Sequence, residues 1–152
     1  MEIVAYREKY RDAFVALNTE WLERFYTVEP YDRDMIERAD ELVRGGGMIY
    51  FALDGDKVLA TCMTMPLCDD SWEMCKLAAV GQYTGSGAGS AVFKACMDYA
   101  LAHGAKRLRL ISCRALAPAI HIYKKFGFHE VPLDRKFWGS EKADIEMEYT
   151  VG

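Results

Sequence analysis

The chain alternates between segments whose apolar residues recur with helical spacing and shorter segments that read as β-strands. Between Arg7 and about Phe25, apolar residues recur on one helical face and charged residues occupy the others, which predicts an amphipathic helix. The apolar positions are Phe14, Leu17, Trp21 and Phe25. Because Pro30 disfavours helical geometry for the residue before it, we expect this helix to end before Pro30.

The rest of the chain is divided by glycine and proline into further short elements. Strands are expected at residues 2–6, 48–54, 57–67, 71–80, 106–111, 128–132 and 142–151. Helices are expected at residues 33–44, from the glycine-rich stretch at 81–90 to Gly104, and at 117–127. Asp54-Gly55-Asp56 predicts a hairpin turn between the second and third strands. With no repeat, linker or low-complexity tract, residues 1–152 are predicted to form a single α/β domain.

Composition narrows the class of protein. With 152 residues, of which 51% are hydrophobic and 28% charged, the chain is long and apolar enough to bury a core. A net charge of −4 disfavours a nucleic-acid-binding surface. The sequence contains no apolar run near the ~20 residues of a membrane span and no secretory pattern at its start, so we expect no membrane contact and a cytoplasmic protein.

The cysteines and histidines show no metal-binding spacing. There are five cysteines and three histidines, and no C-x-x-C pair. We interpret Cys62, Cys68, Cys75, Cys96 and Cys113 as small buried residues in a reducing compartment, and expect no metal.

Four of the twelve glycines lie between Gly81 and Ser90, after a predicted strand and before a predicted buried helix. The first N–H groups of a helix attract phosphate, and glycines let the backbone approach an anion closely. The stretch therefore indicates a pyrophosphate site, with a merely flexible surface loop as the alternative. It lacks the Lys-Ser/Thr pair of a nucleotide P-loop, and Ser90 stands where a dinucleotide fingerprint needs its third glycine.

Two segments together resemble the GCN5-related N-acetyltransferase (GNAT) superfamily. They are YTGSGAGSAVFKACMDYALAHGAKRLRL, residues 83–110, and PAIHIYKKFGF, residues 118–128. The family's acetyl-CoA loop pattern, Q/R-x-x-G-x-G/A, falls on Thr84, Gly87 and Gly89. Its later signature, A-I-x-L-Y-x-K-x-G-F, is matched by Ala119, Ile120, Ile122, Tyr123, Lys125, Gly127 and Phe128.

The resemblance implies a mixed, mainly antiparallel sheet with helices on both faces. We expect its core to include Phe14, Leu17, Val92, Cys96, Leu108, Leu110 and Ile120. It also implies an acetyl-CoA site in which the strand before the glycine loop splays from its neighbour. Pantetheine would bind along Leu77, Ala78 and Ala79, and pyrophosphate at Thr84, Gly85, Ser86, Gly87, Ala88, Gly89 and Ser90.

The same resemblance suggests how catalysis would work. Tyr123 occupies the family's usual position for the acid that protonates the leaving thiolate, beside the cofactor, and the alternative is a packed aromatic. Glu73 lies where many relatives place the base that deprotonates the amine. Its apolar sequence neighbours would raise its pKa; the alternative is an exposed carboxylate at a strand edge.

The acceptor amine is expected at the first two helices and the loop between them. Trp21, Tyr26, Glu29 and Tyr31, together with Asp32 and Asp34, would suit a cationic amine. The alternative is a solvated acidic loop with one core tryptophan. The resemblance thus implies an N-acetyltransferase acting on a small-molecule amine or an amino terminus, and a homodimer is one possible assembly.

Several positions depart from the family pattern. Thr84 stands where relatives usually carry Gln or Arg, Ile111 and Cys113 where some carry Glu and Asn, and Leu116 where Asn is often found. The hydroxyls of Ser86 and Ser90 could compensate in part. The alternative function is therefore a CoA-binding sensor with weak or no turnover. An interaction module without a ligand is a third, more distant reading.

Overall fold

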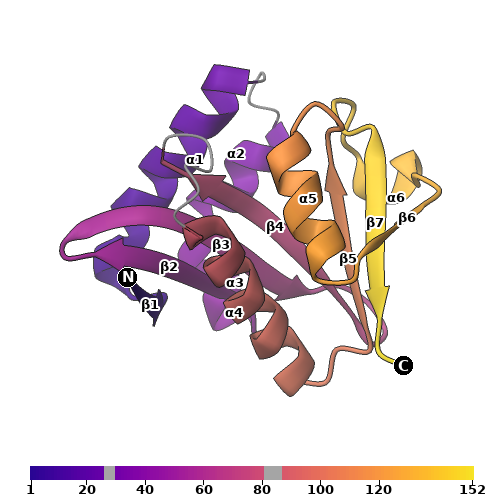
Figure 1. Cartoon of the computed structure of the whole chain (residues 1–152), viewed down its shortest axis with the longest axis horizontal. Helices are drawn as coiled ribbons and strands as arrows, with labels where there is room; N and C mark the ends of the chain where they lie inside the picture. Colours follow the sequence, from indigo (N-terminus) through magenta and orange to yellow (C-terminus); the bar gives the residue numbers. More distant parts are fainter. Residues whose placement is uncertain (26–29, 81–86) are drawn as a thin grey trace.

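The computed structural model describes residues 1–25, 30–80 and 87–152. In these residues seven strands form one sheet in the order β1-β2-β3-β4-β5-β7-β6 (Figure 1). The strands are β1 (Glu2–Ala5), β2 (Met48–Asp54), β3 (Lys57–Pro66), β4 (Ser71–Ala79), β5 (Arg107–Ser112), β6 (His129–Val131) and β7 (Ile145–Thr150). Only β4 and β5 pair in parallel, so the expected mixed, mainly antiparallel sheet is confirmed.

Helices cover both faces of the sheet, as expected. They are the 3-10 helix η1 (Glu8–Tyr10), α1 (Arg11–Phe25), α2 (Pro30–Glu37), α3 (Ala39–Arg44), α4 (Ala88–Ala102), α5 (Ala117–Lys125) and α6 (Arg135–Trp138). In Figure 1, α4 and α5 lie in front of the sheet, whereas α1, α2 and α3 lie behind it. Within the described ranges, no helix combines the length and apolar character needed to cross a membrane.

The segment predicted as one helix over residues 33–44 is two helices. α2 begins earlier, at Pro30, because the first turn of a helix does not need the N–H that proline lacks. The helix is interrupted at Arg38, and α3 then runs to Arg44. The early start of α2 places Asp32 in its first turn, on the buried side.

One short helix was not predicted. The Asp134 carboxylate accepts a hydrogen bond from the Phe137 N–H at 3.1 Å and so caps α6 at its start. Gly139, with a φ of 68°, ends it. Asp134 and Gly139 are residue types that often begin and end a helix, but a helix of four residues is too short to show helical periodicity in the sequence.

The core consists of two clusters, one on each face of the sheet. Five of the predicted core residues are at most 1% exposed: Phe14, Val92, Cys96, Leu108 and Leu110. Leu17 is only partly buried, so for this residue the prediction was wrong, whereas Ile120 is partly buried but packs against the cluster that contains Val92 and Leu110. Asn18, four residues after Phe14, takes the buried position on α1, and α5 turns Ala119 and Ile122 inward instead of Ile120.

The sheet opens between its two parallel strands. β4 and β5 pair only from Ser71 to Glu73, opposite Arg107 to Arg109. Beyond these residues the strands diverge, and in Figure 1 α5 lies over the resulting gap. The splay implied by the family resemblance is therefore present.

β4 is also irregular on its other side. Its register with β3 shifts between Cys75, opposite Met63, and Ala78, opposite Thr61, so that β4 has one extra residue there. Lys76 in this bulge has a φ of 54°, in the left-handed region that few side-chain-bearing residues adopt. A bulge of this kind bends a strand and redirects its side chains, here beside the gap.

Candidate active site

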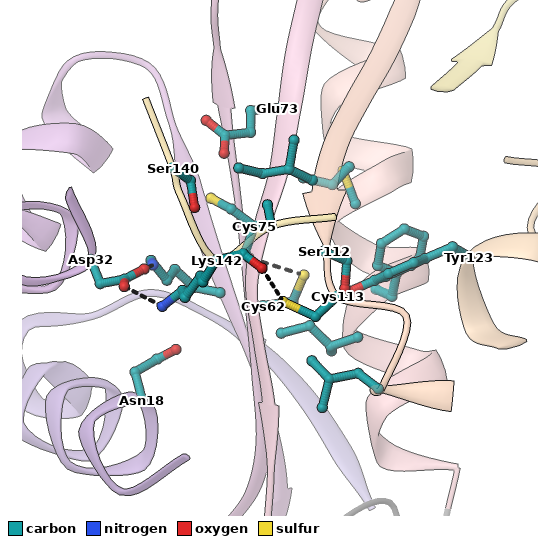
Figure 2. Close-up of a pocket in the computed structure, with 17 residues that line it drawn as sticks. Asn18, Asp32, Cys62, Glu73, Cys75, Ser112, Cys113, Tyr123, Ser140 and Lys142 are labelled. Atoms are coloured by element: carbon teal, nitrogen blue, oxygen red, sulfur yellow. Dashed lines mark hydrogen bonds and ion pairs between the residues drawn. The ribbon is translucent and has the colours of Figure 1, made fainter. Parts of the chain in front are cut away.

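A cavity of about 120 Å³ lies where β4 and β5 separate (Figure 2). Side chains from both helical layers, from three strands and from the segment before β7 reach it. Its polar and sulfur-bearing lining residues are Asn18, Asp32, Cys62, Glu73, Cys75, Lys76, Ser112, Cys113, Tyr123, Ser140 and Lys142. The cavity therefore brings several polar side chains together at the point where the two strands separate.

Glu73 forms part of the β4 wall of this cavity. It is the last residue of β4 that pairs with β5, opposite Arg109, and its side chain is only 3% exposed. β4 is a central strand, so the alternative of an exposed carboxylate at a strand edge is wrong. A buried carboxylate at the point where two strands separate is well placed to exchange a proton with a molecule in the gap.

Tyr123 reaches the cavity from α5 on the opposite side. Its ring packs on Phe93 with 5.2 Å between centroids, and the residue is 8% exposed. Burial raises the pKa of the Tyr123 phenol well above its usual range, and a hydrogen bond with the Ser112 side chain acts in the opposite direction. Tyr123 is thus a packed aromatic whose hydroxyl keeps its proton and lies beside Ser112 at the cavity (Figure 2).

Three thiols lie between these two walls. Burial raises the pKa of the Cys62 and Cys75 thiols well above the usual value, so both stay neutral near pH 7. The Cys113 thiol donates to the Lys142 carbonyl oxygen at 3.3 Å. Cys62 and Cys75 therefore line the cavity as neutral, polarisable thiols. All five cysteines were predicted to be buried, but Cys68 is exposed and Cys75 is only partly buried, which corrects the prediction for these two.

A charged cluster occupies one end of the cavity. The Lys76 ammonium lies 2.6 Å from Asp32 Oδ1, and the Lys142 ammonium donates to Asp32 Oδ2. Desolvation alone would raise the pKa of the Asp32 carboxyl, but Lys76 and Lys142 together hold it below its usual value. Asp32 is therefore ionised and paired with lysines instead of facing a cationic amine as expected. Asp34 pairs with Arg38 at the surface.

The start of α4 lies beside the gap, as a phosphate-binding element would require. Gly87 has a φ of 80°, and a Cβ added to it would meet no atom of residues 1–25, 30–80 and 87–152 within 4 Å, so these residues leave the space beside it open. The next residues, Ala88 and Gly89, are small and buried. Lys125 brings its ammonium to 3.4 Å from the Ser90 hydroxyl, which adds positive charge to the helix start.

These features fit coenzyme A. Leu77, Ala78 and Ala79 belong to the part of β4 that has left β5, so this strand edge faces the gap where pantetheine is expected. The open space at Gly87 and the Lys125 charge suit the phosphates. Thr84, Gly85 and Ser86 lie outside the described residues.

The predicted acceptor residues are only partly described. Trp21 lies in α1 and Tyr31 lies in α2, but the structure does not describe the side chains of these two residues. Tyr26 and Glu29 lie outside the described residues. In residues 1–25, 30–80 and 87–152, no group of three or more His, Cys, Asp or Glu side chains could hold a metal ion.

Sequence reasoning missed several residues of the cavity. Asn18 could have been found, since its spacing of four from Phe14 puts it on the buried helix face. Lys76 owes its position to the bulge, and Ser112 to the strand splay. Lys142 was predicted as the first residue of the last strand, but β7 begins only at Ile145, and Lys142 lies in the segment before it.

Comparison with known proteins agrees with this geometry. Residues 14–128 match the Acetyltransferase (GNAT) family. The fold is similar to an acetyltransferase of the GNAT family from Staphylococcus aureus Mu50 (TM-score 0.88, 13% identity, 99% of each chain covered). It is also similar to an acetyltransferase from Streptococcus agalactiae 2603 (TM-score 0.83, 19% identity, 98% of this chain and 97% of that one covered).

A third similar structure is a PaiA N-acetyltransferase from Thermoplasma acidophilum in complex with coenzyme A (TM-score 0.72, 17% identity, 99% of each chain covered). A comparison with curated protein sequences finds no match. At these identities the structural likenesses show the fold, whereas the family match spans more than half of the sequence. On that match, and with a splayed parallel strand pair beside a glycine-initiated helix, the chain belongs to the GNAT family of acetyltransferases.

Proposed function

We propose that this protein is an acetyl-CoA-dependent N-acetyltransferase that acts on a primary amine. The observation that carries the proposal is the cavity between β4 and β5, which has a buried carboxylate on one wall and a buried phenol on the other. Glu73 and Tyr123 supply a proton acceptor and a proton donor, the pair that aminolysis of a thioester needs.

The chain's own groups divide between binding and proton transfer. The backbone from Gly87 to Ser90, with Lys125, would hold the phosphates, and the free edge of β4 would hold pantetheine. Acetyl-CoA supplies a thioester whose C–S bond breaks as the C–N bond to the amine forms.

Two protons then move. Glu73 takes the proton that the amine loses, and the Tyr123 hydroxyl gives its proton to the departing sulfur. Because burial favours the neutral phenol, Tyr123 returns to its protonated form after each turnover. Ser112, whose hydrogen bond opposes that shift, would stabilise the transient phenolate.

The experiment is an amine screen in which released CoA is detected through its free thiol. We expect thiol release with at least one small amine or amino-terminal peptide. Isothermal titration with CoA, run in parallel, separates the two ways of failing. Binding of CoA without release across the screen would favour the sensor, and absence of CoA binding would contradict the proposal entirely.

A further inference from the structure

Arg109 carries a positive charge into the interior of the protein. It lies on β5, a central strand of the sheet, and its side chain is only 10% exposed. Removing a charged group from water is costly unless its surroundings compensate the charge. The contacts of Arg109 therefore show which groups hold it in place, and its position shows which other groups its charge can affect.

Glu146 and helix α6 hold the Arg109 guanidinium in one place. Arg109 Nη2 donates to Glu146 Oε2 at 3.2 Å, and Glu146 Oε1 accepts a hydrogen bond from the Asp134 N–H at 3.0 Å. The guanidinium carbon lies 4.3 Å from the ring centroid of Phe137 and 5.0 Å from that of Trp138. Because aromatic faces attract cations, these two rings add to the hold on the guanidinium. The Arg109 charge is thus fixed in position and largely removed from solvent.

Arg109 and Glu73 point to the same face of the sheet. The two residues lie directly opposite each other where β4 pairs with β5. The residues on either side of them belong to the core cluster that contains residues of α4 and α5: Trp72, Met74, Leu108 and Leu110. Because side chains alternate along a strand, Glu73 and Arg109 both point to the other face. Directly paired residues of adjacent strands have Cβ atoms about 5 Å apart, so a cation and a carboxyl start from neighbouring positions.

A buried carboxyl needs positive charge nearby if it is to act as a base. Glu73 is 3% exposed, and burial disfavours the charged form of a carboxyl. A base must be ionised before it can take the proton that an amine loses. A fixed arginine on the adjacent strand favours the ionised form, since opposite charges attract strongly where water is excluded.

We propose that Arg109 is a positioning residue of the candidate active site: its charge, fixed by Glu146, keeps the buried Glu73 carboxyl ionised. The inference rests on the proposed function, in which Glu73 takes the proton of the amine, and adds a residue that prepares Glu73 for this step. Arg109 is not among the described residues that line the cavity, so it acts through Glu73 and not on a bound molecule.

Other charged groups surround Glu73 as well. In the described part of the chain they come from α2, β4, β5, β7 and the segment before β7, and they are Asp32, Lys76, Arg107, Lys142, Glu146 and Glu148. The three thiols and the Tyr123 phenol of the cavity are titratable, and α1 contributes the neutral Asn18 amide. Glu73 has interactions besides those described above, so its ionisation does not depend on Arg109 alone. The test therefore changes the Arg109 charge and keeps the other groups.

The test is the titration of the Glu73 carboxyl, followed by NMR of protein labelled with ¹³C in its glutamate side chains. The Glu73 signal is identified by its loss in Glu73→Gln, and the measurement needs no turnover. Arg109→Met alone would leave the buried Glu146 without the cation that it pairs with. The comparison is therefore between Glu146→Gln and the double variant Arg109→Met/Glu146→Gln, which differ only at residue 109. Arg109→Gln/Glu146→Gln serves if the methionine variant does not bind CoA as the parent protein does.

The Glu73 midpoint should be at least about one pH unit higher in the double variant than in Glu146→Gln, because a nearby arginine lowers the pKa of a carboxyl by about 1–3. Glu146→Gln should itself lower the midpoint relative to the parent, since it removes a negative charge. Equal midpoints in the two variants would overturn the inference. Arg109 would then be a structural residue, whose loss changes stability and not this titration.

Arg107→Met is the matched control. Arg107 lies two residues earlier on β5, on the same face, and pairs with Glu148 at 3.2 Å, but its side chain is 46% exposed. Solvent and salt screen such a charge, so the Glu73 midpoint should move by no more than about 0.3 pH unit. A shift as large as that caused by loss of Arg109 would contradict a specific role of the buried arginine.

The pH dependence of kcat/KM, measured by thiol release, separates this inference from the proposed function. If Glu73 is the base, the acidic limb of the profile moves to higher pH in the double variant by as much as the NMR midpoint. A shifted midpoint with an unshifted limb, or with no thiol release at all, would support the effect of Arg109 and contradict Glu73 as the base. If thiol is released and neither quantity moves, the transfer stands and the role of Arg109 is overturned.

Discussion

The Tyr123 side chain shows how one residue serves both packing and chemistry. Its ring contacts Phe93 in the core, while its hydroxyl reaches Ser112 and the cavity. Tyr123→Phe keeps the ring and removes only the proton donor. We expect kcat for acetyl transfer to fall by about 10²–10⁴-fold, the usual contribution of general acid catalysis, with stability changed by about 1 kcal/mol.

The control for this prediction is a partly buried tyrosine outside the cavity. Tyr149 on β7 packs on Phe128 with 5.9 Å between ring centroids and is not a lining residue of the cavity. Tyr149→Phe should leave kcat near the parent value. An undiminished kcat in Tyr123→Phe would return Tyr123 to the role of a packed aromatic and leave the thiolate to depart unassisted.

The contacts of single side chains were the feature of the candidate site that was hardest to predict from the sequence. Glu73 and Tyr123 could be named because they sit in recognisable segments, a central strand and a signature helix. Lys76 and Lys142 are 66 residues apart in the sequence and both pair with Asp32. No local pattern encodes such a meeting, because it depends on how α2, β4 and the segment before β7 pack together.

The start of α4 carries the prediction at the scale of elements. Gly87 is held at a φ of 80°, and the described part of the chain places no atom within 4 Å of a Cβ added there. Gly87→Ala introduces only backbone strain, whereas Gly87→Glu also puts a negative charge where the phosphates are expected. We expect the alanine variant to bind CoA a few-fold more weakly than the parent, and the glutamate variant at least tenfold more weakly than the alanine one. Isothermal titration with CoA measures both.

The alanine variant is the control for strain, so the comparison isolates charge. Equal affinities of the two variants would mean that the phosphates lie elsewhere. Raising the salt concentration should reduce the difference between them, because salt screens charges at an exposed site.

The helices and strands were predicted better than the breaks and bulges within them. β2 runs over the expected residues, and β3 and β4 each end one residue early, since alternating apolar residues and the Gly55 turn define them. The break at Arg38 and the bulge at Lys76 were not predicted. Both arise from contacts with other elements, which a window of local sequence does not contain.

For the whole molecule, the mixed, mainly antiparallel sheet was expected from the family resemblance and not from periodicity, and the order of its strands was not predicted. Local patterns define which segments are strands, but the parallel pairing of β4 with β5 depends on a crossover through α4. The same pairing, cut short after Glu73, creates the cavity. The strand pairing that defines the topology of the sheet therefore also forms the candidate site.

Asp32 links three elements across that cavity, so its effect should appear in the stability of the whole chain. Asp32→Asn removes the carboxylate with which two largely buried lysines, Lys76 and Lys142, form ion pairs. We expect the free energy of unfolding at neutral pH to fall by about 3 kcal/mol, as for other broken buried ion pairs. Denaturant titration measures it. Asp34→Asn, on the same helix but in an exposed pair with Arg38, should change it by no more than about 0.5 kcal/mol.

The pH dependence of the free energy of unfolding tests whether Asp32 is ionised in the folded protein. The pKa of Asp32 in the folded protein lies below its ordinary value of 3.8, so the folded state binds the proton less readily than the unfolded chain. The stabilisation is therefore complete well above pH 3.8, and it is lost as the pH falls through 3.8 toward the lower folded value. The stability difference between the parent and Asp32→Asn should be constant around neutrality and shrink in this acidic range. A difference that grows on acidification would mean that Lys76 and Lys142 do not hold Asp32 in its ionised form.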